Sequence, residues 1–390
     1  MSKAPHNPPF RAEQLGSLKR PAELLQARAA FDQGKITSDE LHVIEDKHIS
    51  EIVEMQHSVG IKGITDGEFR RHMFYDGVFD NLEGMVFMKP EMFMPYVPDI
   101  MAFKEHDFKN AATYICKSKI KRTKPFYKDQ FLGLAKFVPP EEVKNIKLTM
   151  CVPHWFHLRH GPYAYPKDVY KNDEEYFADI AQAYREELAE LYSIGCRNIQ
   201  FDDPMICYFC SESMLEGMKN DGLDSEAILD LYIKTYNDAV QGLPEDFNVG
   251  IHLCRGNFKD GRHFAEGGYD RIAVKLFNHL NVRTYYLEYD TERAGTFEPL
   301  KHLPRNKTVV LGLISTKLRA LEDIDQLENR VRGAAETIAG GDEKRSVEEA
   351  LDHPQCGFAS HSEGNQVTED DVKRKLALVV EASKRIWQDA

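Results

Sequence analysis

His252 and Cys254 are the residues whose types and spacing most directly suggest chemistry. They stand two residues apart in an apolar run, residues 249–257. Side chains alternate between the two faces of a β-strand, so both would point to the same face if this run is a strand. A neutral imidazole nitrogen and a thiolate are half of a tetrahedral zinc site. The pair therefore predicts a metal site, and the alternative is a buried cysteine that acts as a small hydrophobe.

Other polar residues stand where further buried strands are expected to end. These positions hold Ser17, Glu68, His154 or its neighbour Trp155, Asp202, Glu288, Ser315 and Cys356. From this set we choose Glu288 and Cys356 to complete the zinc site with His252 and Cys254. Glu288 is the only charge on its inward strand and therefore needs a cation or a hydrogen-bond partner. The alternative is a salt bridge from Glu288 to one of three nearby arginines, Arg255, Arg283 or Arg293.

The chosen ligands would form an electron-rich zinc site. Two thiolates, a carboxylate and a neutral imidazole leave such a site formally anionic. Zinc of this kind is a poor Lewis acid for activating water, which disfavours a hydrolase. It is suited to binding a substrate thiol as a thiolate, which would then attack an electrophilic carbon. Glu288, the hardest ligand, would most easily give up its place to the incoming sulfur.

Cys207 and Cys210 form a C-x-x-C, a spacing found in redox and zinc-knuckle motifs. No second C-x-x-C accompanies this pair in the sequence, and a zinc site needs four ligands, so ordinary packing is favoured. The seven cysteines are an odd number spread over a long chain. They do not suggest a disulfide framework, and a reducing compartment would keep them available as thiolates.

The elements that must position these residues alternate between strand and helix. Strands are expected near residues 11–18, 60–65, 113–120, 147–152, 196–201, 247–254, 284–288, 308–315 and 354–358. Helices are expected near residues 22–33, 38–59, 173–194, 225–240, 272–280, 320–338 and 368–387. This alternation predicts a parallel α/β architecture. Polar residues follow many different strands and no G-x-G-x-x-G follows the first, which favours a closed TIM (β/α)8 barrel over an open sheet.

The candidate strands number one more than a barrel of eight can hold, so one is expected in an outer hairpin. Residues 77–145 are the least regular part of the sequence and are rich in Met, Phe, Pro and Lys. We interpret them as an insertion or lid over the barrel mouth. Residues 1–390 are expected to form a single domain of this kind.

Composition excludes some partners. The net charge of −13 argues against nucleic acid, because phosphates need a basic face that no segment supplies. The N-terminus has no apolar signal-peptide core, and no segment approaches about eighteen consecutive apolar residues, so no membrane partner is expected. These features predict a cytoplasmic protein with small-molecule substrates. The oligomeric state is left open, a homo-oligomer included.

These residues resemble the zinc barrel of cobalamin-independent methionine synthase, and most closely its short, single-barrel, methionine synthase-like relatives. The resemblance spans nearly the whole chain. The stretches that carry it are Leu15-Gly-Ser-Leu, Thr65-Asp-Gly-Glu-Phe-Arg-Arg, Ile199-Gln-Phe-Asp-Asp-Pro, Ile251-His-Leu-Cys-Arg-Gly-Asn, Phe264-Ala-Glu-Gly-Gly-Tyr, Leu287-Glu-Tyr-Asp and Pro354-Gln-Cys-Gly-Phe.

The resemblance implies a cofactor, Zn2+, and a role for each matching residue. The four chosen ligands match the zinc ligands of the family. Ser17 matches the Gly-Ser element that holds the amino-acid carboxylate. Glu68 and Asp202 match the acidic pair that binds the homocysteine amine. Two carboxylates from different strands would give a buried ammonium both charge and direction.

The departures from the family concern the methyl donor. Full-length methionine synthase has an additional N-terminal barrel that helps to bind folate polyglutamate, and a chain of this length is not expected to hold one. Ser315 stands where the family has a catalytic histidine. Trp155 and His157 are candidates for lining a donor pocket, with ordinary loop packing as the alternative. Arg70 and Arg71 could hold an anionic donor or acceptor, or could form barrel-end salt bridges.

Three functions follow. The first is a zinc-dependent methyltransferase that moves a methyl group from a methylfolate, a methylated corrinoid protein or a small methylated molecule to a thiol such as homocysteine. The second is alkylation of another thiol, for example by an epoxide. The third is a non-catalytic barrel that keeps zinc for structure. Glu68 and Asp202 favour the first over the third, because a structural metal gives no reason for amine-binding carboxylates beside it.

Overall fold

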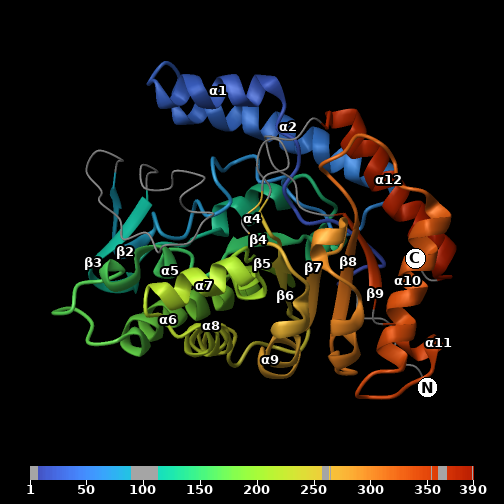
Figure 1. The fold of residues 1–390 in the computed structure, drawn as a ribbon. Coiled ribbons are helices and arrows are strands. Elements are labelled where there is room, and N and C mark those ends of the chain that lie inside the picture. Colours follow the sequence, from blue (N-terminus) through green and yellow to red (C-terminus); the bar gives the residue numbers. More distant parts are fainter. Residues whose placement is uncertain are drawn as a thin grey trace.

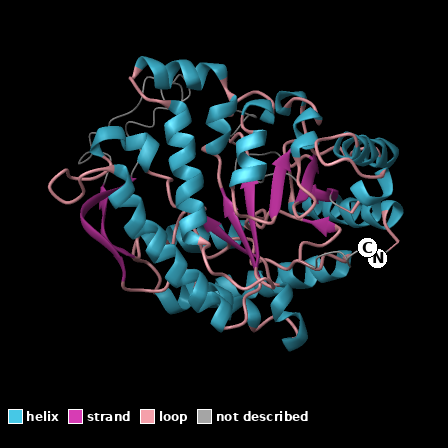
Figure 2. Cartoon of the chain, turned by 90° about the horizontal axis from the view of Figure 1, so that it is seen from below, coloured by secondary structure: helices cyan, strands magenta, loops and turns pink. Residues whose placement is uncertain are grey.

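A parallel sheet forms the centre of the protein in the computed structural model, which describes residues 8–88, 113–256, 263, 265–352, 354–358, 367–388 and 390. Only the backbone is described for residues 354–358, Arg159 and Pro162. The strand order is β1-β9-β8-β7-β6-β5-β4. The strands are β1 (Ala12–Glu13), β4 (Leu148–Cys151), β5 (Asn198–Asp202), β6 (Asn248–Leu253), β7 (Thr284–Glu288), β8 (Thr308–Ile314) and β9 (Pro354–Phe358). Figure 2 shows these strands surrounded by helices.

Residues 61–67 occupy the position between β4 and β1 and close the sheet. On one side, the Lys147 amide donates to the Ile64 carbonyl at 2.8 Å. On the other side, Ser17 and Gly67 form a parallel bridge beyond the end of β1. Both edges of the sheet are thereby covered, as barrel closure requires. The predicted (β/α)8 barrel is confirmed.

The expectation of a regular strand at residues 60–65 needs correction, because the segment lies in a strand position without a continuous ladder. The Gln56 side chain accepts from the Thr65 amide at 3.0 Å and donates to the Thr65 carbonyl at 2.9 Å. The side-chain amide of Gln14 donates to the Gly63 carbonyl at 3.3 Å. Side-chain amides therefore satisfy backbone groups that a neighbouring strand would otherwise pair.

Helices cover the outside of the sheet and enclose the apolar core. They are α1 (Ala22–Asp32), α2 (Ser38–Val59), α4 (Lys128–Ala135), α5 (His157–His160), α6 (Asp173–Ser193), α7 (Glu212–Asn220), α8 (Ser225–Ala239), α9 (Ala273–His279), α10 (Ile324–Ala339), α11 (Val347–Ala350) and α12 (Glu369–Ile386). Short 3₁₀ helices are η3 (Pro140–Asn145), η4 (Gly161–Tyr163), η5 (Ile206–Cys210), η7 (Tyr269–Arg271), η8 (Glu292–Ala294) and η9 (Glu298–His302). The long predicted helices are confirmed, whereas α4 and α7 were not predicted.

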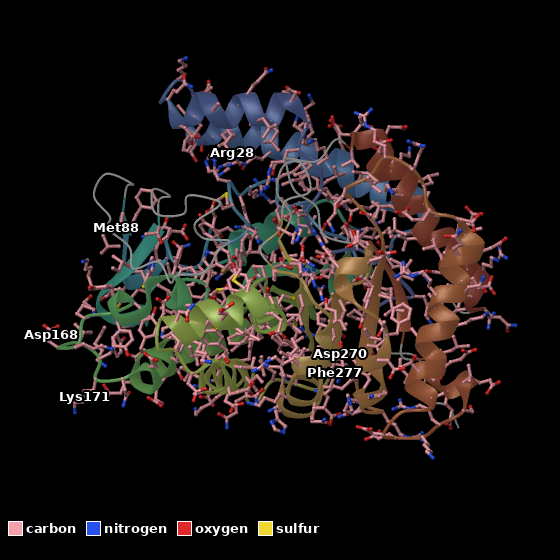
Figure 3. All side chains as sticks on the ribbon, in the orientation of Figure 1. Arg28, Met88, Asp168, Lys171, Asp270 and Phe277 are labelled. Carbon is pink, nitrogen blue, oxygen red and sulfur yellow. The ribbon has the colours of Figure 1, made fainter. Side chains whose placement is uncertain are left out.

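The helices α1 and α2 lie along the top of Figure 1, and α2 leads into residues 61–67. A capping box starts α2, and Gly60 ends it in the left-handed conformation, with φ at 91°. Arg28, labelled in Figure 3, donates to Glu45 at 2.7 Å and also to the Phe69 carbonyl. The helical pair is thereby attached to the turn that follows the closing segment.

The strands β2 (Leu82–Met88) and β3 (Thr113–Arg122) form an antiparallel hairpin outside the barrel sheet, within residues 77–145. Figure 1 shows this hairpin at the left, apart from the central strands. It lies beside the segment after β4, because His160 Nε2 is 3.0 Å from Thr113 Oγ1. The predicted strand near 113–120 is confirmed as the one outside the barrel, and β2 was not predicted.

Candidate functional site

His252 is oriented by a carboxylate on the neighbouring strand. It pairs with Asp202 in the register of β5 and β6, and its Nδ1 lies 3.1 Å from Asp202 Oδ1. Its Nε2 is buried and has no hydrogen-bond partner among the described residues. Metal-binding histidines have this arrangement, in which a carboxylate holds one ring nitrogen and leaves the other free to bind.

Cys254 lies one residue beyond β6 and is close to the end of β7. Burial, and after it the negative charge of Glu288, raise the pKa of the Cys254 thiol to about 12. Leu253 pairs with Leu287 in the parallel register of β6 and β7, so Cys254 and Glu288 are the next residues along these two neighbouring strands. The ends of β6 and β7 therefore bring these two predicted ligands together.

Glu288 ends β7 and is 2% exposed. Its Oε1 accepts bonds from Arg293 Nη2 at 2.6 Å and Lys317 Nζ at 3.2 Å, while its Oε2 accepts one from the Arg255 amide at 3.1 Å. Burial opposes the charged form, but the Lys317 and Arg293 cations outweigh it and lower the pKa of Glu288 to about 2. The salt bridge weighed as an alternative is therefore present with Arg293.

Ser315 joins the same charged cluster through Asp290. The Ser315 hydroxyl and the Lys317 ammonium each donate to Asp290 Oδ2 at 2.7 Å. Lys317 thus links Asp290 to Glu288. We call Glu288, Asp290, Arg293 and Lys317 the cation-rich side of the site.

Glu68 stands in a left-handed turn, with φ at 60°, a conformation that residues with a side chain seldom adopt. Asp66 Oδ1 holds the turn by accepting from the Glu68 amide at 2.9 Å. The Glu68 carboxylate accepts from Thr149 at 2.8 Å and lies 3.8 Å from the Arg71 guanidinium. Burial raises the pKa of Glu68, Arg71 opposes this, and the charge of Asp202 adds to it. Glu68 bonds to Thr149 on β4, and β4 pairs with β5, which ends at Asp202, so the two carboxylates belong to neighbouring parts of the sheet and we call them the acidic side.

Ser17 lies beside the turn that carries Glu68, through its bridge to Gly67. Gly16, which precedes it, has a φ of 110°, and a Cβ at this position would come within 2.3 Å of Thr149 Cγ2. Only glycine allows the chain to approach Thr149 so closely. The Gly-Ser pair is thereby placed next to the threonine that bonds to Glu68.

Arg70 and Arg71 are adjacent in sequence but contact different parts of the molecule. Arg71 is buried beside the acidic side and donates to the Thr149 carbonyl at 2.9 Å. Arg70 pairs with Glu45 at 3.0 Å and with Asp46, both on α2. Arg70 therefore forms the salt bridges weighed as its alternative and also lines a cavity that Tyr75 shares, whereas Arg71 lies beside Glu68 and Thr149.

Trp155 and His157 follow β4 and have different surroundings. Trp155 stacks on Tyr75 with ring centroids 5.7 Å apart, and Tyr75 lines a cavity of about 840 Å³. His157 Nδ1 lies 3.1 Å from the Tyr232 hydroxyl and its Nε2 lies 3.2 Å from Asp173. These are the packing contacts weighed as the alternative for His157, with Tyr232 on α8 and Asp173 on α6, and its place in a donor pocket stays a prediction.

The donor chemistry around His252 fits a zinc ion. A cavity of about 10 Å³ lies between His252 and Glu288, and is also lined by Leu15, Tyr286, Leu287, Val310 and Gly312. His252 Nε2, which has no hydrogen-bond partner in the described part of the chain, offers one ligand atom, and Cys254, a free cysteine two residues further along, could offer a second. Glu288 Oε2 accepts one hydrogen bond, and a carboxylate oxygen has a second lone pair.

The described side chains do not by themselves complete a metal site. Among them, no group of three or more His, Cys, Asp or Glu is arranged to hold a metal ion. Glu288 instead bonds to Arg293 and Lys317. Cys356, the fourth predicted ligand, belongs to β9, which pairs with β8, and its side chain lies outside the described residues.

Sequence reasoning missed Asp290 and Lys317. Each stands two residues beyond a residue that was singled out, Asp290 after Glu288 and Lys317 after Ser315. The same spacing joined His252 to Cys254 and could have found both. Their opposite charges at neighbouring strand ends were the available signal.

Comparison with known proteins identifies the family of the chain. Residues 162–385 match the family model for the catalytic domain of cobalamin-independent synthase. The chain belongs to the cobalamin-independent synthase family. Two uncharacterized family relatives from Bacillus subtilis, YxjH and YxjG, are each 35% identical, over 381 and 390 residues. These alignments cover 97% and 98% of this chain and 95% and 96% of the relatives.

Relatives named as methionine synthases also span the chain. The methionine synthase of Saccharolobus solfataricus is 22% identical over 390 residues, covering 96% of this chain and 98% of its own. The solved structure of a putative vitamin-B12 independent methionine synthase from Listeria monocytogenes has a TM-score of 0.72 and 28% identity, covering 97% of this chain and 98% of its own. A B12-independent methionine synthase structure from Shewanella shares the fold, with a TM-score of 0.68, 19% identity and coverage of 97% and 98%.

Membership places the chain among methionine synthase-like methyltransferases and supports an enzyme. The family uses zinc, in agreement with the donor atoms around His252. Within the described parts of the chain, no helix has both the length and the apolar character needed to cross a membrane.

Proposed function

We propose that the chain is a zinc-dependent methyltransferase that methylates a thiol such as homocysteine, with residues 1–390 acting as one catalytic domain. His252 carries this proposal, because Asp202 lies at its Nδ1 and its buried Nε2 has no hydrogen-bond partner among the described residues, beside a cavity that Glu288 also lines. Family membership supports methyl transfer. The relatives named as methionine synthases support an acceptor whose methylation yields methionine.

The zinc would be held by His252, Cys254, Glu288 and Cys356. When bound, it supplies the positive charge that keeps a substrate thiol ionised near neutral pH. Asp202 favours the tautomer of His252 that carries its proton on Nδ1, so the lone pair of Nε2 is available.

The acidic side would bind the amino group of the substrate. Glu68 is buried, its guanidinium neighbour is 3.8 Å away, and burial raises its pKa, so an added ammonium would stabilise its charged form. Asp202 would contribute the second carboxylate. Ser17, on the other side of the Glu68 turn, would donate to the substrate carboxylate, with Arg71 supplying positive charge nearby.

The methyl donor would approach past Trp155. The cavity lined by Tyr75 has a volume of about 840 Å³, within the range of small-molecule sites. A methylfolate, a methylated corrinoid protein and a small methylated molecule are the donors to compare. Alkylation by an epoxide would use the same thiolate and is the alternative electrophile.

The first experiment measures zinc in purified protein and in a Cys356→Ser variant, with Cys196→Ser as a matched control. We expect one zinc per chain in the wild type and the control, and loss of both zinc and activity in Cys356→Ser. Full zinc occupancy in Cys356→Ser would contradict the ligand assignment.

The second experiment screens thiols against methyl donors and epoxides, with detection of the product mass. Methionine from homocysteine is the expected product. Zinc-edge absorption should show an added sulfur ligand when homocysteine is bound. An unchanged spectrum at saturating homocysteine would indicate a different thiol.

A further inference from the structure

Cys207 and Cys210 stand one turn apart in the 3₁₀ helix η5. Such a helix has about three residues per turn and rises about 2 Å per residue, so residues i and i+3 lie on the same side with Cα atoms about 6 Å apart. A disulfide spans Cα separations of roughly 4.4–6.8 Å. The backbone therefore holds the two thiols at a distance that a disulfide can bridge.

The helix that carries this pair is anchored by Asp203. Its Oδ1 accepts from the Met205 and Ile206 amides at 2.8 and 3.0 Å. Its Oδ2 accepts from the Tyr236 hydroxyl at 2.7 Å. Because Asp203 is fully buried, the start of η5 has a rigid support, which favours a fixed spacing between the two cysteines.

The two sulfurs differ in exposure and surroundings. Cys207 is fully buried, whereas Cys210 is partly exposed. A hydrogen bond from the Cys207 thiol lowers the pKa of Cys210, burial opposes this, and the Arg255 cation adds to the lowering. Burial raises the pKa of Cys207. Cys210 therefore suits the role of attacking thiolate, and Cys207 that of the thiol that closes the bridge.

We propose that Cys207 and Cys210 form a reversible disulfide by exchange with a small-molecule disulfide. The Cys210 thiolate attacks one sulfur of that molecule, whose S–S bond breaks, and one small thiolate leaves as a mixed disulfide forms. The Cys207 sulfur attacks the Cys210 sulfur, which forms the protein S–S bond, and the proton of Cys207 passes to the second small thiolate, which leaves as a thiol. The protein pair loses two electrons, and the small disulfide gains them. This exchange is independent of the proposed methyl transfer.

The experiment equilibrates reduced, full-length protein with mixtures of oxidised and reduced glutathione, alkylates free thiols and digests with trypsin. Both cysteines fall on one tryptic peptide, residues 198–219, because Arg197 precedes it and Lys219 ends it. We expect this peptide to lose two hydrogens and to take up no alkyl group as oxidised glutathione increases. Dithiothreitol should restore both alkylation sites.

Other cysteines provide internal controls. Cys116, Cys151 and Cys196 are buried, and burial raises the pKa of each thiol. We expect them to stay reduced in the folded protein. A doubly alkylated 198–219 peptide at every glutathione ratio would overturn the proposal, and so would a crosslink from either thiol to Cys254.

Two variants separate the roles of the thiols. Cys207→Ala should retain glutathione on Cys210 as a stable mixed disulfide, because no second thiol releases it. Cys210→Ala should take up no glutathione, since Cys207 is buried. Equal modification of both variants would contradict the assigned roles, and the wild-type peptide map decides the proposal even if one variant does not fold.

Discussion

Two pairs of acidic side chains lie at the candidate site, and their surroundings differ in charge. On the cation-rich side, Glu288 contacts Arg293 at 2.6 Å and Lys317 at 3.2 Å, and its pKa falls to about 2. On the acidic side, the Glu68 carboxylate lies 3.8 Å from the Arg71 guanidinium, Arg20 donates to the Glu68 carbonyl at 3.1 Å, and burial still raises the pKa of Glu68.

This difference indicates where a positively charged substrate group would be stabilised. A buried carboxylate with too little positive charge nearby gains from an added cation, whereas one already paired gains little. The amine of an amino-acid thiol therefore fits Glu68 and Asp202. Glu288 already bonds to Arg293 and Lys317, so it would bind a metal ion while these cations stay beside it.

The largest expected effect on stability comes from removing a cation from the cation-rich side. Lys317→Met leaves Glu288 and Asp290, whose side chains are 1% and 0% exposed, with one positive charge fewer. We expect the free energy of unfolding to fall by about 3 kcal/mol, the range for breaking a buried ion pair. Urea unfolding of the metal-free protein measures this change.

Lys234→Met is the matched control for this prediction. Lys234 pairs with Asp238 on the surface, and their side chains are 63% and 38% exposed. Exposed pairs of this kind contribute less than about 1 kcal/mol. Equal losses in the two variants would remove the distinction between the cation-rich side and an ordinary surface pair.

Glu68→Gln should weaken binding of the substrate amine. Replacing a charged acceptor with a neutral one costs about 2 kcal/mol, which corresponds to a rise of roughly thirtyfold in the KM for homocysteine. The control is a substrate of the same length that lacks the amine, 4-mercaptobutanoate, whose KM should not change. A similar rise for both thiols would show that Glu68 does not contact the amine.

Asp202→Asn should distinguish the two members of the acidic side. Asp202 lies 3.1 Å from His252 Nδ1, whereas among the described residues no hydrogen bond joins Glu68 to His252. Loss of such a carboxylate typically lowers metal affinity, here by about tenfold. Competition with a chromophoric chelator measures it, and Glu68→Gln should bind zinc as the wild type does. Unchanged affinity in Asp202→Asn would contradict the role given to His252.

The smallest effect is expected at Asp173, a partly exposed carboxylate outside both sides of the site. The hydrogen bond from His157 lowers the pKa of Asp173 to about 2, against the effect of burial. Because the folded pKa lies below the ordinary value of 3.8, this contribution is present above pH 3.8 and is lost as the pH falls toward 2.

Asp173→Asn removes that dependence. We expect the variant to be slightly less stable near neutral pH and to lose stability less steeply between pH 3.8 and about 2 than the wild type. Urea midpoints at a series of pH values test this. Parallel curves for the two proteins would exclude the Asp173–His157 pair as the cause of the slope.

Much of the barrel could be predicted because its strands are short apolar runs that alternate with helices of 3.6-residue period. The run at β6 predicted both a strand and the common face of His252 and Cys254. Residues 61–67 were harder, because the side chains of Gln14 and Gln56 replace part of the strand ladder there. Hydrogen bonds from side chains to the backbone leave no periodic pattern in the sequence.

The neighbours Arg70 and Arg71 show why the site was only partly predictable. Nothing in their type or spacing distinguishes them. The left-handed turn at Glu68 places Arg71 near Thr149, while Arg70 reaches Glu45 on α2. The direction of each side chain depends on a backbone turn and, for Arg70, on a carboxylate 25 residues away in sequence.

The sequence by itself determined which groups stand at the strand ends: an imidazole, thiols and carboxylates whose types suit a thiol-binding zinc. Barrel closure decided which of them meet and which cation accompanies each carboxylate. Ionic and metal contacts act over only a few ångströms, whereas Glu288 and Lys317 are 29 residues apart and Glu68 and Thr149 are 81 apart. Only the tertiary structure brings such pairs within range. It alone therefore shows which carboxylates belong to the cation-rich side and which to the acidic side.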